Sequence, residues 1–440
     1  MNDRAEYGSP RVTTGLVVFV AALVALAPLP FGSVRPLAWS ACVAATGLAL
    51  VLFILAGGRR VSRPPGWMMG LGALLLLALV CQVLPIGRIW PLTFDLGGNE
   101  IVSDSLSLNP GATALMILRL AGYGLFLMIV LTISANPRRA TTLLHIGFGV
   151  TVIYAGLGLL MLVHGGDTIL GVQKWVYQGF ATGPFVNHNS FAAFLAMGLS
   201  AGLASLFAVL ASELPKSGKF AYSAMIVLCL AVVGTALLAT VSRMGVATAL
   251  AGAVVATLIG LTRLGHRAVG MIVLAALLGG GILLAVGAGD DLLARTFGID
   301  ISLDSRWALY SQVWDAILQR PLLGYGGGSF YWSFAPFAHP PLLGDVEWTK
   351  AHSTVLQWWF ELGLVAGSVP LLLYGGTLFS LIRRAFQRES WYLNLAAIGA
   401  LVAAGLHSLI DFQLEIPANA YFAILLIGIG LSGRRAGPQA

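Results

Sequence analysis

Charged residues are scarce in this chain, and their scarcity excludes a soluble protein. Only 10% of the 440 residues are Asp, Glu, Lys or Arg, whereas 58% are hydrophobic. A soluble globular protein carries about a quarter of its residues as charged types. So few charges cannot cover a water-facing surface, and lipid must therefore surround much of the chain. The composition indicates an integral membrane protein.

The sequence also has few of the residues and motifs that hold metals or nucleotides. Its cysteines, Cys42, Cys81 and Cys229, lie far apart in apolar runs, and no C-x-x-C pair or Cys/His cluster occurs. This excludes a disulfide framework and a zinc site of the usual spacing. A P-loop, a G-x-S-x-G, an H-E-x-x-H and a D-x-D motif are missing as well. A divalent metal would need clustered carboxylates, so we predict neither a metal nor another cofactor.

Long apolar runs make up most of what remains. A helix needs about 20 mainly apolar residues to cross the hydrocarbon core of a membrane, and the 54 glycines would let such helices approach closely. We therefore predict an all-α polytopic membrane protein that forms a single integral membrane domain over residues 1–440, with about twelve spans. The spans are expected at 13–31, 36–56, 67–86, 112–134, 141–163, 189–211, 219–240, 244–262, 268–288, 355–382, 391–411 and 416–433.

Basic residues mark one side of the predicted membrane. They are concentrated in alternate connections, such as GGRRVSRPP, NPRRA and IRRAFQRES, whereas most acidic residues lie in the other connections. Cytoplasmic loops carry the excess of Lys and Arg in membrane proteins. We therefore predict that both termini are cytoplasmic. The net charge of +7 is then a topology signal, and we predict no nucleic-acid partner.

One predicted outside loop, residues 289–354, is much longer than the others. Its apolar residues recur at helical spacing over 306–318, which predicts an amphipathic helix lying on the membrane. Gln319-Arg320-Pro321 should end that helix, and GYGGGSF should form a flexible turn. Loops longer than about 12–15 residues are usually functional in a compact protein, so we expect this loop to carry part of the site.

Cations on the predicted outer half of the molecule are candidates for chemistry, because charge at membrane depth is costly. Arg243, in TVSRMG, either caps the seventh span as a snorkelling side chain or clamps a phosphate with its rigid fork. Arg306 either lies on a solvated helix face, pairs with Asp304 or binds substrate. Lys174 precedes Trp175 and serves either as an interfacial anchor or as a substrate contact.

Two polar clusters stand at the starts of apolar spans. GPFVNHNSFA places Asn187, His188 and Asn189 at the mouth of the sixth span. Asn189 is a plausible N-cap, but capping does not explain three polar residues together. We therefore include all three among the substrate-binding candidates.

His352 stands directly before the span that begins in AHSTVLQWWFELGL, at the end of the long loop. Ser353 and Thr354 can cap that helix unaided, which leaves His352 either as a histidine facing water or as a catalytic base. The remaining candidates for substrate binding are Arg119, Arg320, Tyr325 and Lys350.

Five segments taken in order carry a family resemblance. They are GPFVNHNSFA, TVSRMGVATAL, DSRWALYSQVWDAILQRPLLGYGGGSF, AHSTVLQWWFELGLVAG and LHSLIDFQLEIPAN. In this order the chain resembles the O-antigen ligase and O-antigen polymerase superfamily of bacterial polysaccharide assembly. The resemblance covers roughly residues 180–420, and the first five spans match only in hydropathy.

The resemblance implies a GT-C-like glycosyltransferase of the bacterial inner membrane with its active site facing the periplasm. The donor would be a glycan linked to undecaprenyl diphosphate. The acceptor would be the lipid A core for a ligase, or another lipid-linked glycan for a polymerase. The family's functional arginines fall on Arg243 and Arg306, and its histidine falls on His352.

The chemistry of these residues agrees with the resemblance. A neutral imidazole can deprotonate an attacking hydroxyl, which is worth roughly 10²–10⁴-fold in rate, and two arginines can stabilise a leaving diphosphate without a metal. Two alternatives remain. A lipid-linked oligosaccharide flippase or other transporter would be expected to show two related halves and polar midplane helices, and a non-catalytic scaffold would tolerate loss of His352.

Overall fold

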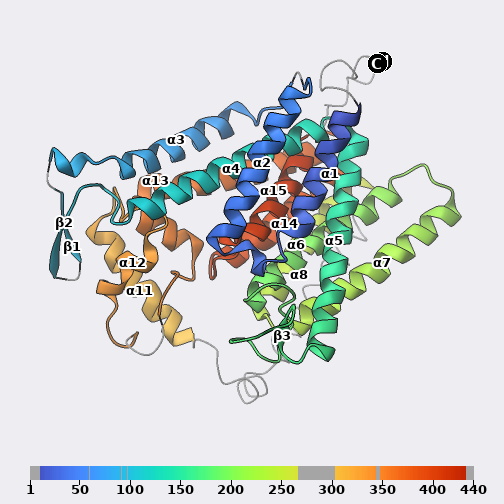
Figure 1. Ribbon diagram of the computed structural model, residues 1–440. Coiled ribbons are helices and arrows are strands. Elements are labelled where there is room, and N and C mark those ends of the chain that lie inside the picture. The colour runs from blue at the N-terminus through green and yellow to red at the C-terminus, as the bar shows by residue number, and fades with distance from the viewer. Residues whose placement is uncertain are drawn as a thin grey trace.

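The computed structural model describes residues 10–58, 60–90, 92–96, 98–265, 303–342 and 347–432. In these residues the chain is mostly helical (Figure 1). The predicted ninth span, 268–288, and the first part of the long loop lie outside the described residues. The α-helices are α1 (Pro10–Leu26), α2 (Pro36–Leu55), α3 (Gly66–Val83), α4 (Pro110–Ser134), α5 (Pro137–His164), α6 (His188–Leu210), α7 (Lys216–Ala239), α8 (Arg243–Arg263), α11 (Leu303–Gln319), α12 (Phe330–Phe334), α13 (Thr354–Ala385), α14 (Trp391–Ser408) and α15 (Pro417–Leu431).

The multi-pass helical class predicted from the apolar runs is confirmed. Within the described ranges, nine helices are long and apolar enough to cross a membrane, and two shorter apolar helices correspond to α1 and α15. Each of these eleven helices lies on a predicted run. The count of twelve spans and the orientation in the membrane stay predictions.

Helix α14 lies at the centre of the bundle, packed against α6 and α8. Small residues bring these helices together. A Cβ on Gly252 of α8 would lie only 2.3 Å from the carbonyl oxygen of Gly399 in α14, and a Cβ on Gly399 would lie 2.7 Å from Oγ of Ser200 in α6. Glycine is therefore required where the three helices meet, as expected for closely packed membrane helices.

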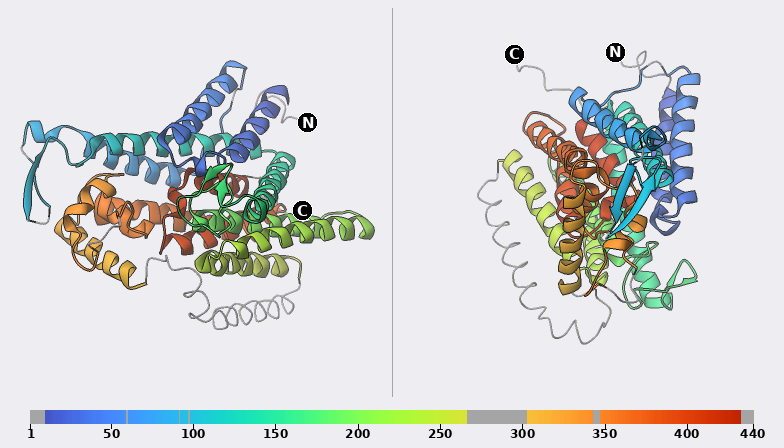
Figure 2. Two further views of the ribbon diagram at one scale, coloured as in Figure 1. Left: turned by 60° about the horizontal axis from the view of Figure 1, so that its bottom comes forward. Right: turned by 90° about the vertical axis from the view of Figure 1, so that its left-hand side faces the viewer.

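A second, smaller layer covers one end of the bundle. It contains an antiparallel hairpin of β1 (Leu92–Leu96) and β2 (Asn99–Ser103), which the sequence analysis did not foresee. The hairpin, α11 and α12 lie at one end of the molecule, away from α7 at the other (Figure 1), and the left view of Figure 2 shows the hairpin at the rim. Their apolar side chains form a separate core with the start of α13, which includes Phe94, Leu309, Tyr325 and Phe360.

Helix α13 is broken at Gly363, whose φ of 77° and ψ of 167° are not helical. The loop after α11 fills the break, because Leu364 N donates to Pro321 O at 2.7 Å and Gly326 N donates to Glu361 O at 2.8 Å. A Cβ on Gly324 would lie 2.5 Å from Glu361 O. The glycines of the GYGGGSF loop therefore allow close packing against α13, and the predicted flexibility of this turn stays a prediction.

The remaining strands and short helices connect the long helices. A second small hairpin lies in the loop after α5. These elements are β3 (Thr168–Ile169), β4 (Val172–Gln173) and the 3-10 helices η1 (Phe31–Ser33), η2 (Ile86–Arg88), η3 (Ala335–Phe337) and η4 (Gln413–Glu415).

Candidate active site

His352 precedes α13 in a backbone conformation that few non-glycine residues adopt. Its φ is +48°, a left-handed value that costs about 1–3 kcal/mol and is found mainly where the surroundings require it. The hydroxyl of Tyr310 fixes this backbone by donating to His352 O at 2.7 Å. The imidazole lies edge-on between the rings of Trp348 and Phe412. Only 17% of its side chain is exposed, so the ring is largely enclosed by its neighbours.

Asp411, in the turn after α14, faces this imidazole. Its Oδ1 lies 3.7 Å from His352 Nδ1, and only 3% of its side chain is exposed. Burial would raise the pKa of the Asp411 carboxyl, but the neighbouring His352 and His407 and the backbone N–H of Phe412 hold that pKa below its usual value. Asp411 is therefore a buried carboxylate aimed at His352, as is required to orient a histidine base.

Other hydrogen bonds fix Asp411 and link it to α6. Gln413 Nε2 donates to Asp411 Oδ2 at 2.8 Å, and Asn419 Nδ2 donates to Gln413 O at 3.2 Å and to Ser190 O at 3.1 Å. The backbone of Asp411 also accepts from Thr354 Oγ1 at 3.1 Å. The starts of α13, α15 and α6 are thus joined around one carboxylate.

Arg306 lies one helical turn before Tyr310 on α11. Its Nε is buried and has no hydrogen-bond partner among the described residues. The charges of Arg306 and Asp411 both reach the Tyr310 hydroxyl, whose pKa burial raises to about 12. Arg306 therefore lies beside the His352–Asp411 pair with an Nε–H group that makes no hydrogen bond among the described residues. An anionic group could accept a hydrogen bond from it. The predicted pair with Asp304 involves a side chain that lies outside the described residues.

The predicted polar cluster before the sixth span meets the start of α8. Ser242, the N-cap of α8, donates from Oγ to Asn189 Oδ1 at 2.6 Å. The ring of His188 is buried between Tyr177 and Phe180, and its Nδ1 lies 2.8 Å from Thr240 O. Arg243 is the first residue of α8, and its side chain is exposed. The two sequence segments are therefore in contact, with Arg243 at their surface.

The cap of α6 differs from the one predicted. Asn187, not Asn189, is the N-cap residue, and its side chain accepts from Asn189 N at 2.7 Å. Asn189 is thereby left to bind Ser242. The predicted cap of α13 is confirmed, because Ser353 Oγ accepts from Leu356 N.

Lys350 is held by an acidic network next to His352. Its Nζ lies 2.5 Å from Glu415 Oε2, and Gln357 Nε2 also donates to that oxygen at 3.1 Å. Gln357 Nε2 lies 3.1 Å from the buried carboxylate of Glu361 as well. Lys350 therefore neutralises an acidic group at the site.

Three of the other predicted substrate contacts occupy different surroundings. Tyr325 is completely buried, stacks on Phe360 and donates to Ala316 O, so it belongs to the core of the smaller layer, and its role in substrate binding stays a prediction. Lys174 donates to Phe180 O at 2.7 Å within its own loop. Arg119, on α4, lies over the ring of Trp39.

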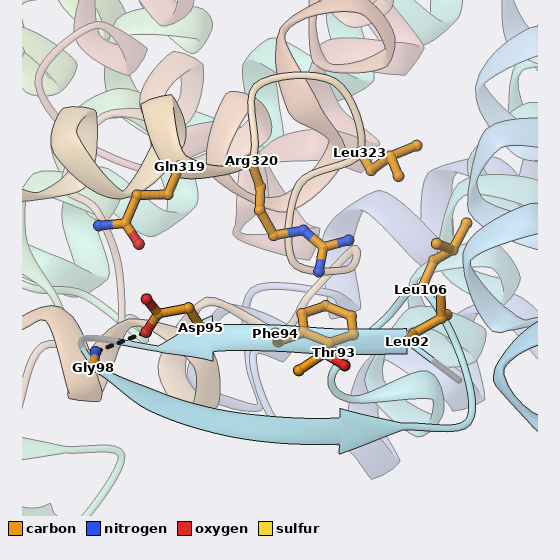
Figure 3. A pocket seen from close by; sticks show the side chains of 9 residues that line it. All are labelled: Leu92, Thr93, Phe94, Asp95, Gly98, Leu106, Gln319, Arg320 and Leu323. Carbon is orange, nitrogen blue, oxygen red and sulfur yellow. Dashed lines mark hydrogen bonds between the residues drawn. The ribbon is translucent and has the colours of Figure 1, made fainter. Parts of the chain in front are cut away.

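Arg320 follows α11 and projects into a cavity of about 650 Å³ beneath the β1–β2 hairpin. Its guanidinium carbon lies 3.8 Å from the centroid of the Phe94 ring (Figure 3). Burial lowers the pKa of this guanidinium. Arg320 follows the end of α11, whereas Arg306 lies near its start. The structure therefore does not bring Arg320 into the His352 cluster.

An apolar groove of about 310 Å³ begins beside the cluster and runs along α13 and α14. Its lining includes Thr354 and Ser408 near the cluster and Leu371, Leu378 and Val402 further along the helices. Thr354 also bonds to the backbone of Asp411. The groove therefore leads from the polar cluster along the apolar side chains of α13 and α14.

Asp411 is the functional candidate that the sequence analysis missed. The signal available was its position in LHSLIDFQLEIPAN, one helical turn after His407 at a helix end. Nothing local shows that it meets a histidine 59 positions earlier, because that contact depends on how α13 and α14 pack. In the described part of the chain, no group of three or more His, Cys, Asp or Glu side chains is arranged to hold a metal.

A family model described as O-Antigen ligase matches residues 224–371, from the middle of α7 to the second part of α13. The matched stretch contains Arg243, Arg306 and His352, whereas Asp411 lies outside it. No curated protein matches the chain.

Proposed function

We propose that the chain is a glycosyltransferase of the bacterial inner membrane, because a family model described as O-Antigen ligase matches residues 224–371. It transfers a glycan from undecaprenyl diphosphate to an acceptor hydroxyl on the periplasmic face. The observation that carries this proposal is the His352–Asp411 pair, with Nδ1 and Oδ1 3.7 Å apart beside Arg306.

His352 acts as the general base in this scheme. Asp411 faces Nδ1, which favours the tautomer with the proton on Nδ1 and leaves Nε2 unprotonated. Nε2 then takes the proton of the acceptor hydroxyl as its oxygen attacks the anomeric carbon. The imidazolium that forms is stabilised by the Asp411 carboxylate, in the same way that a buried acid supports other histidine bases.

The arginines stabilise the leaving group. As the new C–O bond forms, the bond from the anomeric carbon to the phosphate oxygen breaks, and undecaprenyl diphosphate leaves with the electron pair. Charge therefore develops on the diphosphate, where the unused Nε of Arg306 and the exposed Arg243 would bind it. Direct attack predicts inversion at the anomeric carbon, which product NMR would show.

The groove along α13 and α14 supports a lipid-linked donor. It is lined by apolar side chains of both helices, and its polar end lies at Thr354, which bonds to Asp411 O. A polyprenyl chain in this groove would bring its diphosphate to the cluster. Each methylene removed from water contributes about 0.8 kcal/mol, but lipid already supplies an apolar environment, so the groove would serve mainly to position the chain.

Transfer by the purified protein tests this proposal. The protein would be reconstituted in liposomes with polyprenyl-diphosphate-linked glycan, an acceptor and EDTA. We expect glycan transfer and release of polyprenyl diphosphate. A strict requirement for Mg²⁺ would contradict stabilisation by arginine alone, and glycan movement across the bilayer without transfer would identify a flippase instead.

Ligase and polymerase activities differ in the acceptor. The same assay would offer the lipid A core and a lipid-linked glycan in separate reactions. Transfer to the lipid A core assigns a ligase, and lengthening of the lipid-linked glycan assigns a polymerase.

A further inference from the structure

The cavity beneath the β1–β2 hairpin lies far from the His352 cluster, in the smaller layer that covers one end of the bundle. Its volume of about 650 Å³ is in the range of pockets that enclose small ligands. Asp95 and Phe94 of β1 border it on one side, and Gln319 and Arg320 border it on the other (Figure 3). Helix α11 separates the two sites. Arg306 lies near its start and Gln319 at its end, which at the helical rise corresponds to about 20 Å.

The side chains of this cavity, which we call the hairpin pocket, have the chemistry that binds sugars. Arg320 is stacked on Phe94, which leaves the edge of its guanidinium pointing into the pocket. No ion pair joins Arg320 to an acidic side chain among the described residues. Gln319 supplies an amide, Asp95 supplies a carboxylate, and leucines complete the wall. This combination of donors, acceptors and apolar surface fits the hydroxyl groups and C–H faces of a glycan.

An anionic headgroup fits the pocket less well. The Asp95 carboxylate lines the same space as the Arg320 guanidinium, so a phosphate bound to the arginine would lie close to a like charge. One oxygen of Asp95 already accepts from Gly98 N at 2.7 Å, which fixes the carboxylate in the tip of the hairpin. The pocket therefore favours neutral hydroxyl groups over phosphate.

We propose that the hairpin pocket binds the transferred polymeric glycan several sugar residues away from its reacting end, through Asp95, Gln319 and Arg320. The inference rests on the proposed function, because the anomeric carbon would react at His352 while the rest of the chain extends over α11. The donor carries the polymer in both a ligase and a polymerase, so the pocket serves either reaction. A donor with a long glycan would be bound at both the His352 cluster and the hairpin pocket, whereas a donor with a short glycan would be bound at the His352 cluster alone.

Binding and transfer together test this proposal. The probe for binding is the released surface polysaccharide of the source bacterium, cut to several repeats and titrated into purified protein. In the double variant Asp95→Asn/Gln319→Ala, we expect about tenfold weaker binding, as for loss of a hydrogen bond to a charged group. Both altered side chains are exposed, so the fold should be retained. The matched control is Asp104→Asn, which removes an exposed carboxylate paired with Arg88 outside the pocket.

Transfer should then depend on donor length. With a donor of several repeats, kcat/KM of the double variant should fall about tenfold, whereas with a donor of one repeat it should equal that of the unaltered protein. Equal glycan affinity in the double variant and in Asp104→Asn would overturn the proposal, and so would equal losses for both donors.

The two proposals can fail separately. His352→Ala should still bind the released glycan with unchanged affinity, although it transfers none at an appreciable rate. If no preparation transfers glycan but the double variant binds it more weakly, the pocket stands and the proposed reaction fails.

Discussion

His352, Asp411 and Arg306 hold polar atoms largely away from water in the candidate site. Asp411 is buried against His352, and Arg306 has a buried Nε without a partner among the described residues. Sequence reasoning identified His352 and Arg306 because their residue types and segment order are visible in the chain. It missed Asp411 and the complete burial of Tyr325, because burial and contacts between distant helices are not encoded in any local pattern.

Replacing Arg306 with lysine tests the fork of the guanidinium. The charge remains, but the planar set of donors is lost, so we expect kcat for transfer to fall about tenfold, corresponding to about 1.4 kcal/mol of transition-state binding. Arg306→Ala should lose more. The control is Arg138→Lys, an exposed arginine at the start of α5. Equal rates in Arg306→Lys and the unaltered protein would exclude a bidentate role.

The Asp411 carboxylate should also affect stability in acid. Its pKa in the folded protein lies below the usual value near 3.9. Its ionised form therefore contributes stability above that usual value, and the contribution is lost as the pH falls through the lower folded pKa. We expect Asp411→Asn to flatten the loss of thermal stability below about pH 4, measured by unfolding in detergent between pH 3 and 7. The control is Asp315→Asn, at an exposed site on α11, which should lose thermal stability below about pH 4 as the unaltered protein does. The same flattening in Asp315→Asn would contradict the role given to the Asp411 carboxylate.

At the scale of elements, hydropathy located the helices but not the way in which they are interrupted. The described spans and the amphipathic helix α11 follow the predicted runs, because length and apolar period are local properties. The break at Gly363 and the β1–β2 hairpin were not foreseen. Both depend on partners distant in sequence: the break is filled by the loop that follows α11, and the hairpin packs Phe94 beneath Arg320.

Gly363→Ala tests whether the break in α13 needs glycine. A Cβ at this position would lie 2.3 Å from Leu322 O, and the positive φ is unfavourable for alanine. We expect the variant to lose about 1–3 kcal/mol of stability, seen as a lower unfolding temperature. Gly375→Ala, also in α13, has nothing within 4 Å of the added methyl group and should unfold at the temperature of the unaltered protein. Equal behaviour of the two variants would refute the requirement.

At the scale of the whole molecule, the predicted orientation places the hairpin layer in the periplasm. A single cysteine can report this in a background in which the three natural cysteines are replaced by alanine. We expect a membrane-impermeant maleimide to label Glu100→Cys in intact cells and to label Lys216→Cys only after lysis. Both positions are exposed, so the reverse pattern would invert the topology and place His352 in the cytoplasm.

The central claim is that His352 is the base of a glycan transfer reaction. The most direct measurement is the single-turnover rate of transfer by His352→Ala in liposomes, compared with His164→Ala, an exposed histidine at the end of α5. Loss of a general base predicts a rate about 10²–10⁴-fold lower for His352→Ala with unchanged donor binding, and an unchanged rate for His164→Ala. A full rate in His352→Ala would contradict the account.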